Sequence, residues 1–153
     1  MKFVGYTTDF EGQVKIEPQL DPIIKDFLDK LSKTRRMSRN LPQEVFGMDG
    51  EFYVDGNGFM GQTDDSTVID HNTPPHTQPG LWCQWVIEDN CIVWDQGEKF
   101  YEYTRWLEYI IGRILKPNGY TCNGVIRWRG EDFNDVGTII VKDNEVQEQS
   151  GVF

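Results

Sequence analysis

Histidine and aspartate side chains gather in one stretch of the chain, between residues 55 and 80. His71 and His76 are the only two histidines, and Asp64, Asp65 and Asp70 lie in the same stretch. Carboxylate and imidazole groups can together hold a divalent metal, and an aspartate beside a histidine can orient a general base. No HExxH motif or other spaced ligand pair accompanies them. One alternative function is therefore a metal- or anion-dependent enzyme, or a small-ligand-binding protein, with its site in this loop.

The same stretch is far longer than the usual connection between elements, which has about 4–6 residues. It is rich in glycine, proline, asparagine and aspartate, which also build compact turns that hold no ligand. We therefore expect a packed or partner-binding loop here. The sequence identifies no catalytic residue, and we expect no cofactor.

Three arginines follow the first predicted helix and form the one basic segment of the chain: Arg35, Arg36 and Arg39. Cations near the C-terminus of a helix are stabilised by its macrodipole, which would give them a purely structural role. Their guanidinium groups are also candidate ligands for an anion. The sequence leaves both interpretations open.

The chain as a whole is acidic, with 25 acidic and 15 basic residues and a net charge of −10. Binding to nucleic acid or to anionic membranes depends on lysine and arginine, so this charge opposes both and favours a basic protein partner. Acidity for solubility alone is the simpler explanation. The carboxylates that we expect to contact a partner are Asp64, Asp65, Asp70, Glu131, Asp132, Asp135 and Glu145.

A β-hairpin over residues 85–94 is the clearest structural element. An Asp89-Asn90 pair suits a two-residue type I′ turn, which pairs Trp85 with Trp94 across the hairpin. Alternation then places Cys83, Trp85, Ile87, Ile92 and Trp94 on one face, which we expect to join the core.

A long amphipathic helix is predicted directly after the hairpin. Asp95 and Glu98 fit a capping box at its start, and apolar residues recur at spacings of three and four as far as Leu115. Lys116-Pro117-Asn118-Gly119 should end it. The tryptophans of the hairpin and Trp106 of this helix would form the core.

Other elements flank these two. We expect a first strand ending at Glu17, a helix over Pro22–Lys33, a short strand over Gly50–Val54 and a strand over residues 120–129. A second Asp-Asn turn, Asp143-Asn144, predicts a C-terminal hairpin whose last strand is an acidic edge.

The predicted fold class is α+β: an antiparallel sheet with two helices packed on one face, in a split βαββαβ (ferredoxin-like) order plus a C-terminal hairpin. A single domain should span residues 1–153, with the long loop at 55–80. Three cysteines without metal-site spacing indicate reduced thiols. The absence of a signal peptide and of an apolar run of about 20 residues predicts a cytoplasmic protein that does not enter membranes.

Several runs of the sequence resemble a family of small uncharacterised proteins in bacterial and phage genomes. These runs are Gly50-Glu51-Phe52-Tyr53-Val54-Asp55-Gly56, Asn72-Thr73-Pro74-Pro75, Gln78-Pro79-Gly80-Leu81-Trp82-Cys83-Gln84-Trp85, Trp94-Asp95, Gly97-Glu98-Lys99-Phe100-Tyr101 and Trp106-Leu107. The family has no established activity, so no site residue carries over. The resemblance implies a cytosolic protein of the kind carried by mobile elements.

Two classes of function follow. The first, which we favour, is a non-enzymatic acidic binding protein that docks on a basic surface, such as a phage or mobile-element inhibitor of a host defence protein (anti-CRISPR-like). Charge complementarity would give fast, salt-sensitive association. The second is the enzyme or ligand-binding protein with its site in the 55–80 loop.

Overall fold

The computed structural model describes residues 5–40 and 66–151. The chain divides into two compact units, one formed by residues 1–21 with 84–153 and the other by residues 22–83. We describe each unit by itself. The expectation of a single domain stays a prediction.

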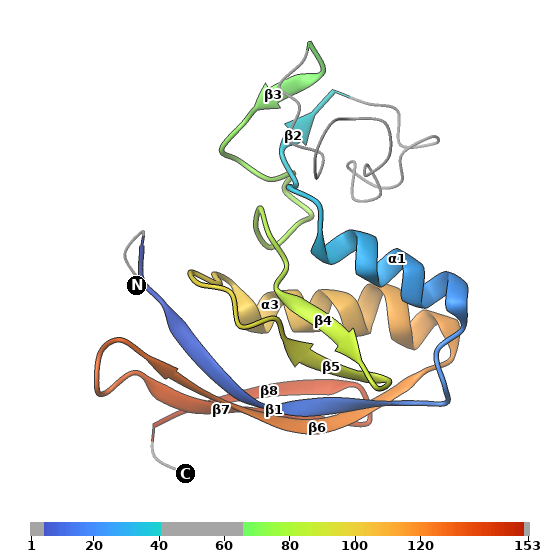
Figure 1. Ribbon diagram of the computed structural model, residues 1–153, viewed down its shortest axis with the longest axis vertical. Helices are drawn as coiled ribbons and strands as arrows, with labels where there is room; N and C mark the ends of the chain where they lie inside the picture. Colours follow the sequence, from blue (N-terminus) through green and yellow to red (C-terminus); the bar gives the residue numbers. More distant parts are fainter. Residues whose placement is uncertain (1–4, 41–65, 152–153) are drawn as a thin grey trace. The chain divides into compact units, whose positions relative to one another are not determined.

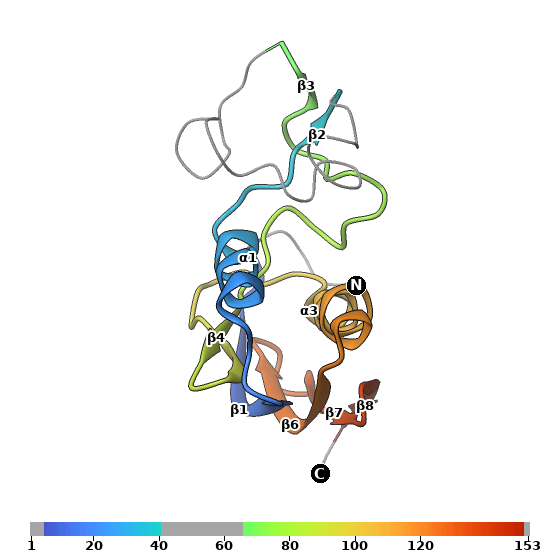
Figure 2. The same cartoon turned by 90° about the vertical axis from the view of Figure 1, so that its right-hand side faces the viewer.

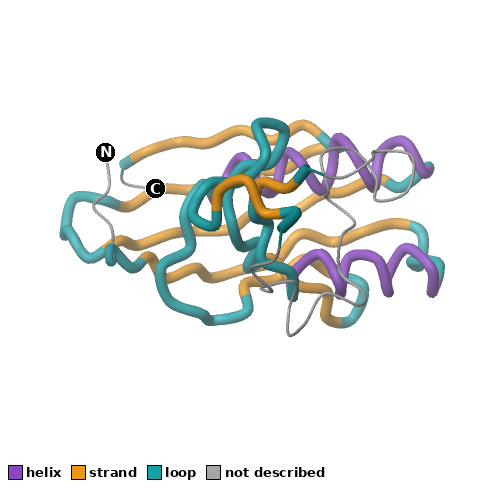
Figure 3. The backbone as a smooth tube through the Cα atoms, turned by 90° about the horizontal axis from the view of Figure 1, so that it is seen from above, coloured by secondary structure: helices purple, strands orange, loops and turns teal. Residues whose placement is uncertain are grey.

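The first unit is built on a six-stranded sheet in which every neighbouring pair is antiparallel. Its order is β4-β5-β1-β6-β7-β8, and the strands run side by side in Figure 3. The strands are β1 (Thr8–Glu17), β4 (Trp85–Glu88), β5 (Cys91–Trp94), β6 (Thr121–Gly130), β7 (Val136–Lys142) and β8 (Glu145–Ser150). β1 lies between β5 and β6, so the helical segment that joins these two strands crosses over β1 (Figure 1).

Both hairpins have the predicted register. Trp85 pairs with Trp94 in β4–β5, and Lys142 pairs with Glu145 in β7–β8. The turn residues adopt the positive φ angles of a type I′ turn: 50° and 59° at Asp89 and Asn90, and 48° and 73° at Asp143 and Asn144. A two-residue turn fixes the pairing of the strands beside it, which is why the sequence predicted both registers.

The helix after the hairpin starts later than expected. α3 spans Tyr103–Tyr109, continues as a π-helical segment η3 (Ile110–Leu115), and ends in a 3₁₀ turn η4 (Lys116–Asn118). The capping-box prediction is wrong, because the Asp95 side chain accepts a hydrogen bond from the Gly97 N–H (2.7 Å) and forms a local turn. Three residues before α3 have left-handed backbone angles and prevent an earlier start: Gln96, Lys99 and Glu102. The predicted end of the helix is confirmed, with Gly119 at φ 88°.

The core of this unit is rich in aromatic side chains. Figure 2 shows α3 lying over one face of the sheet. The ring of Phe10 in β1 lies 5.2 Å from that of Trp85 and 4.9 Å from that of Tyr103, edge to face. The Trp85 indole N–H also donates to the backbone oxygen of Tyr103 (2.8 Å). Trp85 and Trp106 are buried as predicted, whereas Trp94 is half-buried.

The second unit contains α1 (Pro22–Ser32) and a small antiparallel sheet of β2 (Ser38–Arg39) and β3 (Val68–Asp70). Leu28 and Leu31 form the buried side of α1. Ile23, another apolar residue of α1, is 77% exposed. The predicted strand at Gly50–Val54 lies outside the described residues.

The α+β class and the antiparallel sheet with two α-helices are thus confirmed. The finer ferredoxin-like arrangement is not confirmed. β2 and β3, which come between α1 and β4 in the sequence, form a separate sheet, and α1 belongs to the second unit. No helix among the described residues is sufficiently long and apolar to cross a membrane.

Candidate functional site

The most sharply defined charged feature is the turn that joins β6 to β7, residues 131–135, which we call the acidic turn. It lies at one end of the sheet (Figure 1) and carries Glu131, Asp132 and Asp135. Two backbone hydrogen bonds close it: the Gly130 N–H donates to the Asp135 oxygen (2.7 Å), and the Asp135 N–H donates to the Asp132 oxygen (2.9 Å). The main chain of the turn is therefore fixed by its own hydrogen bonds.

Two aromatic side chains hold this turn by hydrogen bonds: Tyr6, which precedes β1, and Trp128 of β6. The Tyr6 hydroxyl donates to Asp135 Oδ2 (2.9 Å), and the Trp128 indole N–H donates to Asp135 Oδ1 (3.1 Å). Tyr6 Oη also accepts a hydrogen bond from the Asp132 N–H (2.9 Å). Asp135 is thus a structural carboxylate, with a donor on each of its oxygens.

A glycine makes room for this network. A Cβ atom on Gly130 would lie 2.2 Å from both Asp135 Oδ2 and Tyr6 Oη, so a side chain there cannot coexist with their hydrogen bond. Glu131 adds a second tie, because its Oε1 accepts from the Thr7 N–H (2.8 Å). The segment before β1 and the end of β6 therefore hold the turn jointly.

The electrostatics keep the Tyr6 hydroxyl protonated. Burial raises the pKa of Tyr6, and the carboxylates of Asp135 and Asp132 raise it further. The hydrogen bond from the Asp132 backbone N–H lowers this pKa, but the net change is a rise. Burial, aided by the nearby charge of Asp135, also raises the pKa of Tyr103. Tyr6 consequently stays a phenol and a hydrogen-bond donor throughout the physiological pH range.

The outer side of the turn faces solvent. Phe133 is 90% exposed, and Glu131, Asp132 and Asn134 are exposed beside it. Within the described residues, neither Glu131 nor Asp132 forms an ion pair with a lysine or an arginine. The turn therefore presents an aromatic ring and uncompensated negative charge on a fixed backbone.

The structure does not gather all of the predicted partner-binding residues into one surface. Glu145 lies at the other end of β7, which has seven residues and so spans about 20 Å. Asp70 belongs to the second unit. Asp64 and Asp65 lie outside the described residues. Among the predicted carboxylates that the structure describes, only Glu131, Asp132 and Asp135 come together.

In the second unit, Asp70 and His71 do not form the predicted acid–base pair. Asp70 instead accepts hydrogen bonds from the Asn72 N–H and the Thr73 hydroxyl, both at 2.9 Å, and these bonds lower its pKa. The Nδ1 atom of His71 lies 3.5 Å from Asn72 Oδ1, and His71 is exposed. Asp70 therefore stabilises a turn and does not orient the imidazole of His71.

The arginines of the predicted anion site contact the protein itself. Arg35 donates to the backbone oxygen of His71 (3.1 Å), and Arg39 donates to the Thr67 hydroxyl (2.8 Å). Arg36 is 2% exposed and points one guanidinium nitrogen at the Leu31 oxygen (3.5 Å). These contacts connect the end of α1 with the strand region around β3, and anion binding by the three stays a prediction.

Metal ligands do not converge in the part of the chain that the structure describes, where no three His, Cys, Asp or Glu side chains form a cluster. His76 is exposed. All three cysteines are buried thiols, and burial raises the pKa of Cys122 to about 11.

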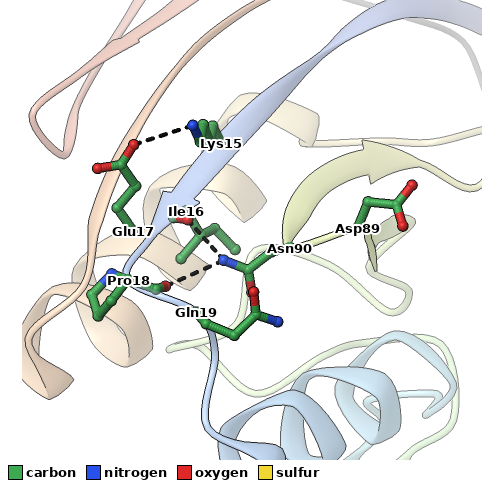
Figure 4. A pocket seen from close by; sticks show the side chains of 7 residues that line it. All are labelled: Lys15, Ile16, Glu17, Pro18, Gln19, Asp89 and Asn90. Carbon is green, nitrogen blue, oxygen red and sulfur yellow. Dashed lines mark hydrogen bonds and ion pairs between the residues drawn. The ribbon is translucent and has the colours of Figure 1, made fainter.

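A hollow of about 410 Å³ lies where β1 ends against the β4–β5 turn (Figure 4). Asn90 lines it and donates to the backbone oxygens of Ile16 (2.8 Å) and Pro18 (3.2 Å). Its Oδ1 accepts from the Leu20 N–H (2.8 Å). Because its amide is engaged by the main chain, we assign the hollow a structural role.

The comparisons with known proteins add no family to these observations. No family model, curated protein or solved structure matches this chain. The resemblance inferred from the sequence stays a prediction, and the function has to be argued from the site.

Sequence reasoning missed Phe133, Tyr6 and Trp128 as parts of one site. A single aromatic residue in an otherwise polar bend, Gly-Glu-Asp-Phe-Asn-Asp, was the available signal for Phe133. Nothing local indicated Tyr6, which lies more than a hundred residues away in sequence and reaches the turn only because β1 pairs with β6.

Proposed function

We propose that this protein is a non-enzymatic acidic binding protein whose acidic turn docks on a basic surface of a protein partner. The observation that supports the proposal is the pair Glu131 and Asp132, which are exposed and have no cationic partner among the described residues. Carboxylates held in this way keep their field available for an incoming positive surface.

The surrounding charge strengthens this field. Residues 130–153 contain six carboxylates and only Lys142 as a cation, so they carry a net charge of −5, half of the chain's −10. Such a field accelerates encounter with a basic surface and opposes direct contact with nucleic acid. A nucleic-acid-binding channel of a host defence protein is positively charged and would attract this negative surface. In this proposal the chain is a phage or mobile-element inhibitor that binds such a channel.

The test compares two variants of equal net charge. Glu131→Gln with Asp132→Asn removes the two exposed charges while keeping side-chain shape and the acceptor for Thr7. Glu88→Gln with Glu108→Gln removes two exposed charges from β4 and α3 and serves as the control. Each immobilised protein is incubated with a bacterial lysate, and retained proteins are eluted with salt and identified.

We expect the wild type and the control to retain a basic protein that elutes as salt rises from about 50 to about 500 mM, because screening weakens exposed charge pairs. The acidic-turn variant should lose it. Equal retention by both variants, or affinity that does not change with salt, would contradict the proposal.

A further inference from the structure

We infer that Phe133 is the anchor of this interface and enters an apolar pocket bordered by arginine or lysine side chains on the partner protein. The inference rests on the proposed function and names the chemistry of the partner's site. It adds a specific contact to what would otherwise be attraction between charges.

The exposure of Phe133 has no explanation within the fold. It is 90% exposed, more than any other large apolar residue among those described, although burial of such a ring is strongly favourable. The next residues in this order lie on α1 and β3 of the other unit: Ile23 at 77% and Ile69 at 68%. Aromatic residues that fill a partner's pocket dominate the binding energy of many interfaces.

The backbone beneath Phe133 is already ordered. Hydrogen bonds on both sides of it fix the main chain at Gly130, Asp132 and Asp135, and Tyr6 bonds the turn to the segment before β1. Binding therefore does not have to order the segment, and little conformational entropy is lost when the ring is captured. A loose loop would present the same ring with much weaker affinity.

The neighbours of Phe133 select the partner. Glu131 and Asp132 would enter the rim of any pocket that accepts the ring, so this rim must carry positive charge. A second copy of the chain would bring the same carboxylates face to face, and an anionic lipid surface would repel them. A protein with a basic-rimmed apolar pocket satisfies both the ring and the charges.

The experiment places the photo-reactive residue p-benzoyl-phenylalanine at position 133 of the full chain and irradiates it in a bacterial lysate. The same residue at Val125, a 46% exposed position on β6, is the control. The cross-linked protein is identified and purified, and its Kd is measured for the wild type, Phe133→Ala, Phe133→Leu and Val125→Ala, with thermal melts to verify folding.

We expect cross-linking from position 133 and not from 125, at a partner site with apolar and basic residues. Phe133→Ala should weaken binding by about 10- to 100-fold, the range of interface hot spots. Phe133→Leu should lose less, and Val125→Ala should bind like the wild type. The salt dependence of Kd should be unchanged in Phe133→Ala, because the charges remain.

Failure takes distinguishable forms. If the partner binds Phe133→Ala as tightly as the wild type but still responds to salt, the anchor is wrong and the proposed function stands. A cross-link to a second copy of the chain would overturn the assignment of the partner. If the wild type retains no protein at all, the proposed function itself fails, and the anchor with it.

Discussion

Tyr6→Phe tests directly whether the acidic turn is held in place by Tyr6 in the segment before β1. The change removes one oxygen atom and keeps the ring, which is 9% exposed. Two hydrogen bonds disappear with it, the one donated to Asp135 Oδ2 and the one accepted from the Asp132 N–H, both 2.9 Å long. Packing is otherwise unchanged, so the effect can be assigned to these bonds.

The expected loss of stability is modest. A hydrogen bond to a charged group contributes about 1.5–3 kcal/mol and a neutral one about 0.5–1.5 kcal/mol. The turn borders solvent, so water replaces part of what is lost, and we discount the sum to about 1.5 kcal/mol. For a chain of this size that corresponds to a fall in Tm of about 3–6 °C.

Two measurements check this prediction. Thermal denaturation gives the change in Tm, with Tyr101→Phe as the control, because Tyr101 Oη accepts only an exposed bond from the Gly5 N–H. Hydrogen exchange gives the local effect: the Asp132 amide, protected by Tyr6 in the wild type, should exchange faster in Tyr6→Phe.

The result that refutes the reasoning is equally specific. If the Asp132 amide exchanges at the wild-type rate and Tm falls no more than in Tyr101→Phe, the turn is not held by Tyr6. The case for a preorganised Phe133 would then lose its main support.

Two further predictions concern the rest of the first unit. Asn90→Ala should destabilise the fold by about 2–4 kcal/mol in urea denaturation, because it removes three hydrogen bonds, whereas Asp89→Ala, at the other positive-φ position of the same turn, should cost only about 1 kcal/mol. For Cys122, burial raises the pKa of the folded thiol from 9.0 to about 11. Its contribution to stability is therefore full below pH 9 and is lost as pH rises toward 11. In Cys122→Ala, the free energy of unfolding should fall less steeply over this pH range than in the wild type. Equal costs at Asn90 and Asp89, or identical pH profiles for the wild type and Cys122→Ala, would contradict these two predictions.

The parts of the fold that the sequence predicted are those set by short-range rules. Two Asp-Asn turns determined two hairpin registers, because a two-residue type I′ turn leaves a single way to pair the strands. The predicted strand over residues 120–129 is likewise present as β6, and the alternation of its side chains matches its buried residues Cys122, Ile126 and Trp128. These signals act over a few residues and need no tertiary information.

The start of α3 shows where local signals fail. Asp95 with Glu98 matches a capping box, but the same sequence also allows a turn in which the Asp95 side chain accepts a hydrogen bond from the amide two residues ahead. Tertiary contacts decide between them: Phe100 packs against Trp85 at 5.1 Å, and the Gln84 amide donates to the Glu98 backbone oxygen at 2.9 Å. Both contacts fix the segment before Tyr103 in a non-helical loop.

The acidic residues show the same limit for function. In the sequence, Glu131, Asp132, Asp135 and Glu145 look equivalent, because only their charge and their nearness along the chain are visible. The fold separates them, since β7 carries Glu145 to the far end of the sheet and two aromatic donors engage Asp135. Only Glu131 and Asp132 remain as exposed charges in the acidic turn.

Asp135 is half-buried and bonded to two donors, whereas its neighbours Glu131 and Asp132 are exposed. A negative charge fixed by Tyr6 and Trp128 holds the backbone of the turn in a single conformation. That conformation is what keeps Glu131, Asp132 and Phe133 pointing into solvent at constant spacing. An interface that depended on net charge alone would need no such scaffold, so the hydrogen bonds beneath the turn favour recognition of one shaped, basic site over general attraction to positive surfaces.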